Sequence, residues 1–256
     1  MKFCLEGWED GQPVQSWLTS PDRWQTQAAE RVTVEVQPGL SVLIQQQPSK
    51  LTANRLGVGA CLWDGALVLT AYLSAQPRDS FQGLRCLELG AGVGLVGLVL
   101  AKLGASVMLT DKPALTSLLR GNVAKNWLGA RPHPSVPADR PRGRADVAAL
   151  EWGKPGYMDQ VAAFAKEPLD LVVATDCCYI DPEGETPDSN HFVKACAGLC
   201  SAKTRCLVTF ETRSDELRQG FLTAAQTKFS HVEQIPHSQV PEEYQVEYIE
   251  LYELRL

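Results

Sequence analysis

The sequence lacks a long uninterrupted apolar run. Its first residues, MKFCLEGWEDGQ, contain no apolar signal core, and the run over residues 91–110 is interrupted by Lys102 and rich in glycine. We therefore expect neither a signal peptide nor a membrane span. An excess of positive charge is also missing, since the formal net charge is −6. This balance gives no general attraction to nucleic acid or to an anionic membrane, and it favours a neutral or basic partner.

The cysteines follow neither a disulfide framework nor a zinc pattern. Most of them lie within apolar stretches, which is typical of reduced core residues and favours the cytoplasm, and also the nucleus, as the location. One further group could be considered as metal ligands, but its spacing fits none of the usual zinc sites, so we expect no metal. That group consists of His191, Cys196, Cys200 and Cys206.

Residues 85–97, RCLELGAGVGLVG, carry the most informative motif. A short apolar run gives way to glycines at alternate positions and then to an apolar helical pattern, which predicts a strand, a tight turn and a helix. Glycine permits positive φ and lets a ligand approach the backbone, while the N–H groups that open the helix attract polar ligand groups. We therefore expect a nucleotide-like ligand at this turn.

Two ligand classes fit the glycines. The dinucleotide spacing G-x-G-x-x-G is satisfied by Gly92, Gly94 and Gly97. Asp111 follows at the end of the next apolar run, where a ribose hydroxyl would be held. A turn that binds no ligand is the third interpretation.

Glu88 separates the two ligand classes. It lies two residues before Gly90 and extends the series to E-x-G-x-G-x-G, the pattern of S-adenosylmethionine methyltransferases. A carboxylate at this place suits a cationic cofactor better than a pyrophosphate, which it would repel at close range.

The chain before this motif divides into a polar arm and a structured extension. Residues 1–30 show no steady periodicity, with Trp8, Trp17 and Trp24 as isolated anchors, and predict a loosely ordered arm. Alternating apolar residues on both sides of Pro-Gly at 38–39 predict a hairpin. A buried helix is expected to begin near Asp64, which we interpret as its cap. Trp63 is then either a core anchor or an aromatic wall for the cofactor.

Strands alternate with helices after residue 85. Such a βαβ pattern predicts a mostly parallel sheet with helices on both faces, within one domain over residues 31–256 that comprises an extension (31–84) and a core (85–256). The strands are expected at 85–89, 106–110, 145–150, 169–175, 205–210, 230–235 and 246–256.

Ligands of such sheets bind beyond the carboxyl ends of the strands. The residues there are chemically informative: 88–94, Asp111, 151–153, 176–179 and 211–213. Trp152 is interpreted either as a stacking surface for adenine or as an ordinary loop aromatic.

Two loops carry strong charge. Residues 131–144 hold four arginines and one aspartate, a formal charge of +3 (4 − 1), together with four prolines. Because no aromatic residues interleave with the arginines, a solvated insertion is favoured over a nucleic-acid patch. Residues 181–188, DPEGETPD, hold four acids and would favour a basic partner near the site, unless they form only a solvated turn.

The chain resembles the seven-strand S-adenosylmethionine methyltransferases, and within them the family-16 protein lysine methyltransferases. The resemblance spans roughly residues 31–256, and the motifs that carry it are WDGALVL at 63–69, LELGAGVGLVGL at 87–98, LTD at 109–111, LEWG at 150–153, DCCY at 176–179 and FETR at 210–213. FETR and the closing stretch EEYQVEYIELYEL are most similar to the branch of the valosin-containing-protein lysine methyltransferase.

The resemblance implies a Rossmann-like α/β fold with strand order 3-2-1-4-5-7-6, the last strand antiparallel, preceded by a helix and a hairpin. It implies S-adenosyl-L-methionine as cofactor and no metal. Its substrate would be a protein lysine, with a chaperone-like or AAA ATPase protein as a candidate, and the enzyme would be a monomer that binds neither nucleic acid nor membrane. Thr175 stands where relatives usually have alanine. The cofactor would be bound by Trp63, Glu88, Gly90, Ala91, Gly92, Gly94, Asp111, Trp152 and Thr175.

Asp176 and Tyr179 are the expected catalytic residues. Both follow the fourth strand of the core, next to the first strand in the implied order, so they can face the cofactor. There they would hold a substrate lysine in line with the methyl group; the alternative is that Asp176 caps a turn and Tyr179 packs in the core. Amino-directed nucleic-acid methyltransferases usually place Asn/Asp-Pro-Pro-aromatic at this turn, whereas this chain has Asp-Cys-Cys-Tyr.

Two other function classes stay open at this stage. A nicotinamide oxidoreductase could use the dinucleotide spacing, although no Tyr and Lys pair for a hydride relay is evident. A catalytically silent module could keep the fold and bind the cofactor without turnover. A histidine acceptor in place of lysine is also not separated by the sequence.

Overall fold

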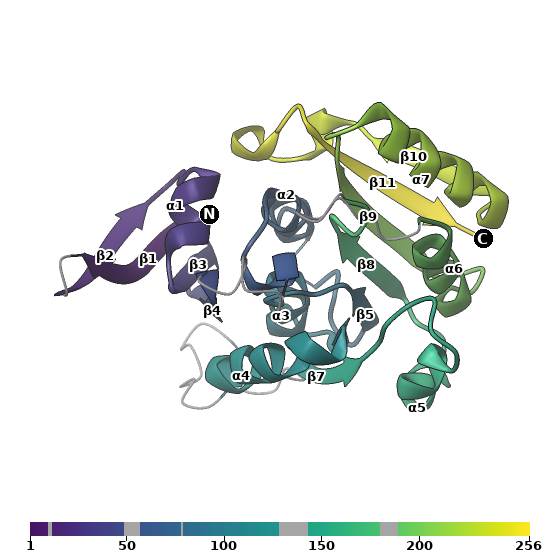
Figure 1. Ribbon diagram of the computed structural model, residues 1–256, viewed down its shortest axis with the longest axis horizontal. Coiled ribbons are helices and arrows are strands. Elements are labelled where there is room, and N and C mark those ends of the chain that lie inside the picture. The colour runs from purple at the N-terminus through teal and green to yellow at the C-terminus, as the bar shows by residue number, and fades with distance from the viewer. Residues whose placement is uncertain (10–11, 49–56, 78, 128–142, 180–188) are drawn as a thin grey trace.

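The structure, a computed structural model, describes residues 1–9, 12–48, 57–77, 79–127, 143–179 and 189–256 (Figure 1). Two sheets organise these residues. One has four strands in the order β2-β1-β3-β4, and the other has seven in the order β10-β11-β9-β8-β5-β6-β7. The loops at 131–142 and 181–188, for which we inferred a solvated insertion and an acidic turn, lie outside the described residues.

The seven-stranded sheet confirms the predicted order. Counted from β5, and with β11 as the seventh strand, it runs 3-2-1-4-5-7-6, and β11 is antiparallel to both β9 and β10. The strands from β7 to β9 are parallel to one another. The strand bounds are β5 Arg85–Leu89, β6 Ser106–Asp111, β7 Arg144–Ala149, β8 Leu171–Thr175, β9 Arg205–Glu211, β10 His231–Ile235 and β11 Ile249–Arg255.

Helices cover both faces of this sheet because its strands alternate their side chains. In β5, Cys86 packs into the core shared with α2, α3 and α4, whereas Leu87 and Leu89 pack into the core shared with α5, α6 and α7. Residues buried on both faces explain the near-continuous apolar runs of the central strands. The helices are α2 Asp64–Ser74, α3 Leu95–Lys102, α4 Thr116–Trp127, α5 Ala162–Ala165, α6 Ser189–Leu199 and α7 Asp215–Lys228.

The four-stranded sheet lies on the side of α2, α3 and α4, and its core-facing residues join theirs. Its hairpin, β3 Arg31–Gln37 and β4 Leu40–Gln45, confirms the prediction. Val32, Val34, Val42 and Ile44 are fully buried. Alternation with polar residues is what made this hairpin recognisable.

The prediction that residues 1–30 form a loosely ordered arm is wrong. They form β1 Lys2–Glu9, β2 Gln12–Leu18 and the short helix α1 Arg23–Ala28. β1 pairs antiparallel with both β2 and β3, so that Phe3 lies opposite Val34. The sequence pattern gave no sign of these strands, because they form through backbone pairing that starts from β3 and not through an apolar alternation of their own. The boundary between an extension and a core after residue 84 stays a prediction.

Helix α2 begins where expected, but Asp64 does not cap it. The N-cap residue is Trp63, which makes no side-chain capping bond. Asp64 is instead the first helical residue, and its carboxylate is paired with Arg23. Among the described residues, no helix is long and apolar enough to cross a membrane.

Candidate active site

A cavity of about 120 Å³ opens beyond the carboxyl ends of the central parallel strands. It lies between the turn after β5, the residues after β6 and β8, and the segment that leads into α2. A larger hollow, of about 340 Å³, lies over the four-stranded sheet and contains none of the predicted site residues. The predicted residues in the wall of the smaller cavity are Trp63, Gly90, Ala91, Gly92, Asp111, Trp152, Thr175, Asp176 and Tyr179.

The turn between β5 and α3 requires glycine at the cavity. Gly90 and Gly92 have φ of 62° and 54°, in the left-handed region that side chains rarely adopt. A Cβ at Gly90 would lie 2.6 Å from Cys177 Sγ and 3.3 Å from the Trp152 ring. Glycine at position 90 therefore lets Cys177 and Trp152 pack against the turn, and the close approach of a ligand to this backbone stays a prediction.

Glu88 and Gly94 are the predicted cofactor residues that the structure keeps out of the cavity wall. Glu88 is buried behind the turn, where one carboxylate oxygen accepts a 2.8 Å hydrogen bond from the Gly97 N–H. Burial raises the pKa of Glu88 to about 8. Gly94, with φ 88°, is the N-cap of α3 and faces Leu119 and Leu109. Both residues shape the turn from behind and do not line the site.

Asp111 holds the turn from the next strand. Its two carboxylate oxygens accept hydrogen bonds of 2.7 Å from the N–H groups of Gly92 and Lys112. Burial raises its pKa, against these two bonds and the Lys112 charge, which lower it. Each oxygen keeps a further lone pair, so the carboxylate can still accept hydrogen bonds from a ligand in the cavity.

Two tryptophans form aromatic walls. Trp63 is fixed by a 2.8 Å bond from its Nε1–H to the Val58 carbonyl, and the Arg213 guanidinium lies 4.9 Å from its ring centroid. Trp152 packs edge-on against Phe192 at 5.6 Å. Both rings therefore have positions set by the fold, and Trp63 is an aromatic wall of the cavity.

Asp176 has the most unusual environment in the site. Its φ of 50° is the one positive value at a non-glycine residue among the described parts of the chain. Its Oδ2 accepts a 3.1 Å hydrogen bond from the N–H of Gly65, in the first turn of α2. Its Oδ1 is buried and has no hydrogen-bond partner within the described residues. A non-glycine residue held at positive φ with an unsatisfied buried oxygen is a feature that clusters at functional sites.

Burial raises the pKa of Asp176 to about 7. The neighbouring carboxylates of Glu211 and Asp64 contribute to this raised pKa, while the Arg213 guanidinium and the Gly65 N–H act against it. Gly65 also makes room for the carboxylate, because a Cβ there would lie 2.3 Å from Oδ2. Sequence reasoning did not single out this glycine of the WDGA segment as a site residue, since it contacts Asp176 only in the folded chain.

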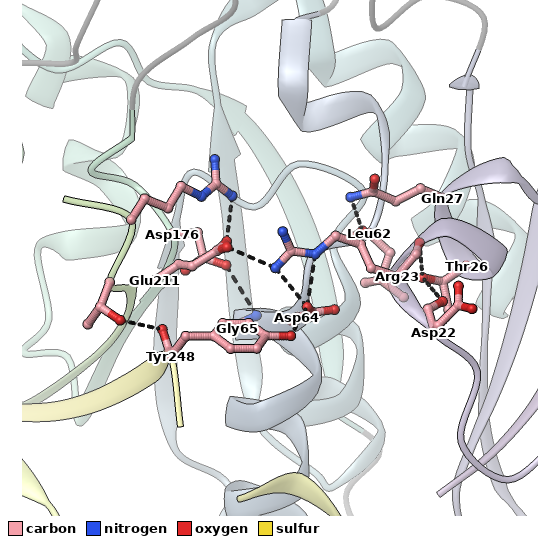
Figure 2. A network of polar contacts seen from close by, with 12 residues as sticks. Asp22, Arg23, Thr26, Gln27, Leu62, Asp64, Gly65, Asp176, Glu211 and Tyr248 are labelled. Atoms are coloured by element: carbon pink, nitrogen blue, oxygen red, sulfur yellow. Dashed lines mark hydrogen bonds and ion pairs between the residues drawn. The ribbon is translucent and has the colours of Figure 1, made fainter. Parts of the chain in front are cut away.

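An ion-pair network lies beside Asp176 (Figure 2), and its member Arg213 also lines the cavity. Arg23 pairs with Asp64 at 2.7 Å and with Glu211 at 2.9 Å, and Glu211 also pairs with Arg213. The Tyr248 hydroxyl donates to Asp64 at 3.1 Å. The sequence marked residues 211–213 as informative, but it gave no signal for Arg23 or Tyr248.

With this geometry in place, the sequence matches the lysine methyltransferase family Methyltransf_16 over residues 46–228. The chain belongs to this family. The predicted family is confirmed, and the oxidoreductase interpretation of the glycine spacing is wrong. The glycines that satisfy the dinucleotide spacing G-x-G-x-x-G belong to the series E-x-G-x-G-x-G, which begins at Glu88 and is the methyltransferase pattern.

Related proteins carry lysine methyltransferase names. Over 129 residues the chain is 40% identical to EEF1A lysine methyltransferase 3 of Mus musculus, and this alignment covers 50% of this chain and 47% of that protein. Over 205 residues it is 32% identical to protein N-lysine methyltransferase METTL21A of Danio rerio, and this alignment covers 76% of this chain and 84% of that protein. The first alignment thus spans about half of either protein. The assignment to the valosin-containing-protein branch stays a prediction.

Solved structures share the fold at low sequence identity. The 16S rRNA N2 G1207 methyltransferase RsmC of T. thermophilus, in complex with AdoMet and guanosine, superposes with a TM-score of 0.55 at 15% identity. This match covers 98% of this chain and 57% of that one. It confirms the fold that the resemblance to the S-adenosylmethionine methyltransferases implies.

Proposed function

We propose that the cavity binds S-adenosylmethionine and that the protein transfers its methyl group to a lysine side chain of a protein substrate. The observation that supports this most is the buried Oδ1 of Asp176, which has no partner within the described residues. A buried carboxylate oxygen needs a donor, and a substrate ammonium or amine supplies one. The family match supports the same reaction.

The wall of the cavity fits the chemical groups of this cofactor. The free lone pairs of Asp111 suit the two ribose hydroxyls, and the Trp152 ring offers a stacking face for adenine. Lys112 and Arg213 also line the cavity and suit the carboxylate of the methionine part. When bound, the cofactor supplies an electrophilic methyl group on a positively charged sulfur.

The substrate lysine must lose a proton before it reacts. A free lysine, with a pKa of about 10.4, is more than roughly 99.9% protonated at pH 7, and neutralising it costs about 4–5 kcal/mol. Its nitrogen lone pair then forms the new C–N bond while the C–S bond breaks and leaves its electron pair on sulfur. No covalent enzyme intermediate is needed, so alignment of the amine is the main contribution of the protein.

Asp176 and Tyr179 are placed to align the amine. The Asp176 carboxylate can accept a hydrogen bond from the amine and stabilise the positive charge that the methylated nitrogen retains. Trp63 and Tyr179 in the wall lower the polarity around the charged amine, which favours its neutral form. Asp176 is therefore assigned as the residue that orients the lysine, and Tyr179 as its aromatic neighbour.

The substrate is assigned here as a protein with a basic, lysine-bearing surface. The net charge of −6 favours such a partner. EEF1A is one candidate substrate because the mouse relative is named after it. A chaperone-like or AAA ATPase protein is another, because of the family branch that the sequence resembles. We propose a monomer in the cytoplasm or nucleus, consistent with the buried free thiols.

One experiment tests the reaction and the substrate together. The purified protein is incubated with S-adenosylmethionine labelled in its methyl group and with purified EEF1A, with an AAA ATPase or with cell extract, and the labelled residue is identified by mass spectrometry. The expected result is a labelled lysine, with label that appears only when the active protein is present. Label on histidine would correct the acceptor, while tight cofactor binding without transfer to any fraction would favour the catalytically silent module.

A further inference from the structure

Arg23 brings the N-terminal segment to the active site. It is the first residue of α1, and its Nε and Nη2 both contact Asp64 Oδ2, at 2.9 and 2.7 Å. Its Nη2 also donates to Glu211 Oε1 at 2.9 Å. Asp64 begins α2 and Glu211 ends β9, so one guanidinium ties three elements together beside the cavity (Figure 2).

These ion pairs are sheltered from water. The side chains of Arg23, Asp64 and Glu211 are 23%, 14% and 10% exposed. Charges in such surroundings interact more strongly than a surface pair does, and an unpaired partner left behind is destabilising. The contacts of Arg23 therefore differ from an ordinary surface ion pair.

Arg23 also lies against two aromatic rings. Its Cζ is 5.6 Å from the ring centroid of Trp63 and 5.7 Å from that of Tyr248. Arg213 occupies another position over Trp63, at 4.9 Å. Guanidinium groups from two distant parts of the chain thus lie against the Trp63 ring in the cavity wall.

The same guanidinium balances the charge around Asp176. Asp64 and Glu211 both disfavour an ionised Asp176, and Arg23 neutralises part of that effect because it pairs with both of them. Within the described residues, the other titratable and charged groups near Asp176 or around the cavity are Arg213 after β9, Cys177, Cys178 and Tyr179 after β8, Asp111 and Lys112 at and after the end of β6, Glu88 in β5, Cys61 before α2, and Tyr248 before β11.

We propose that Arg23 is a positioning residue for methyl transfer, which fixes the cavity wall at Trp63 and keeps Asp64 and Glu211 from opposing the ionised Asp176. This inference rests on the proposed function. It assigns a part in the reaction to a segment that lies outside residues 46–228, the range that matches the family.

The test compares three variants with the wild type in the kcat/KM for methylation across pH. Arg23→Ala removes the charge, and Arg23→Lys keeps the charge but not the two-pronged guanidinium. Arg31→Ala is the matched control, because Arg31 pairs with Glu6 at 2.8 Å in the same N-terminal segment, with side chains 44% and 30% exposed.

We expect Arg23→Ala to lower kcat/KM by about 10²-fold, as a small misplacement in a site can do. Its activity should also begin to rise at a higher pH than in the wild type, because Asp64 and Glu211 then oppose ionisation of Asp176 more strongly. Arg23→Lys should keep the wild-type pH dependence and recover part of the rate. Arg31→Ala should match the wild type in both.

A second measurement does not depend on turnover. The ionisation of Asp176 is followed by NMR in protein with ¹³C-labelled aspartate carboxyl groups, with Asp176→Asn to identify the signal. We expect a higher titration midpoint in Arg23→Ala; if that variant does not fold, Arg23→Gln replaces it. An unchanged midpoint together with a wild-type rate profile would overturn the inference. Absence of methylation by the wild type would instead count against the proposed function, and the titration would still decide the role of Arg23.

Discussion

The carboxylate of Asp176 accepts a hydrogen bond from the backbone N–H of Gly65, a residue 111 positions earlier in the chain. Gly65 lies in the first turn of α2, so the positive end of that helix dipole faces Asp176. One oxygen of Asp176 is held by this bond, which leaves the other directed by the fold and without a partner in the described residues. Under the proposed function, this free oxygen is the one that would accept a hydrogen bond from the substrate amine.

Substituting Gly65 by alanine should separate this contact from the rest of the fold. The new Cβ would lie 2.3 Å from Asp176 Oδ2, so the carboxylate must move. We expect a loss of stability of about 1–3 kcal/mol, typical of overpacking, and at least a tenfold loss of methylation. Gly121→Ala in α4 is the matched control, because no atom lies within 4 Å of its built Cβ. Equal activity of Gly65→Ala and Gly121→Ala would show that the contact does not serve the reaction.

Asp176→Asn should keep the fold and lose most methylation. The amide has the shape of the carboxylate but cannot stabilise a positive nitrogen by its charge. Tyr179→Phe should lose less, since it keeps the ring and removes only the hydroxyl. Single-turnover rates at saturating cofactor check both variants. A wild-type rate in Asp176→Asn, with normal cofactor binding, would remove Asp176 from the catalytic assignment.

The raised pKa of Asp176 predicts a dependence of stability on pH. A folded pKa of about 7 lies above the unfolded value of about 3.9, so the folded protein holds this proton more tightly. The corresponding stability is present below the unfolded pKa and is lost as pH rises through the folded pKa. Asp176→Asn should therefore melt at a higher temperature than the wild type at pH 8, with a difference that shrinks toward pH 4. A difference that does not change with pH would contradict the raised pKa.

Methylation by the wild type should rise with pH through about 7, because the ionised Asp176 is the form that stabilises the positive nitrogen.

Asp111→Ala should weaken cofactor binding more than it weakens the fold. Charge-assisted hydrogen bonds to ribose hydroxyls are each worth about 1.5–3 kcal/mol, and the Gly92 N–H also loses its acceptor. Titration calorimetry on the folded variant measures the loss, and an unchanged affinity would remove Asp111 from the cofactor site.

Cofactor choice is tested by thermal melts. S-adenosylmethionine or its demethylated product should stabilise the protein by about 2.7 kcal/mol at a hundredfold excess over Kd, because only the folded state binds it. NAD should give no shift, since the turn belongs to a methyltransferase family. A shift with NAD alone would contradict the assigned cofactor.

Glu88 shows how far a motif can be read without a structure. The series E-x-G-x-G-x-G pointed to the correct family, and yet the Glu88 carboxylate bonds the Gly97 N–H behind the turn and does not line the cavity. A motif gives the spacing of residues along the chain, while the direction of each side chain depends on which face of β5 it occupies. Glu88 shares its face with α3, so its carboxylate meets that helix.

The sequence by itself determined the features that are local to the chain. Short apolar runs specified the strands of the core, alternating apolar residues specified the hairpin, and the glycines at 90 and 92 specified a turn that requires positive φ. These patterns depend only on residues that are near one another in the chain, so they can be identified from the sequence without a structure. The carboxyl-end rule then placed Asp111 and Asp176 at one edge of the sheet.

Tertiary structure alone decided the contacts between distant residues. Arg23 meets Glu211 across 188 positions, and Asp176 meets Gly65 across 111. No periodicity encodes such pairs, because their distance is fixed by how the sheets and α2 pack. The strand β1 likewise exists as a strand because β3 lies beside it to accept and donate its backbone hydrogen bonds. Residues far apart in sequence therefore acquire their chemical roles only when burial brings their charges together and excludes water from between them.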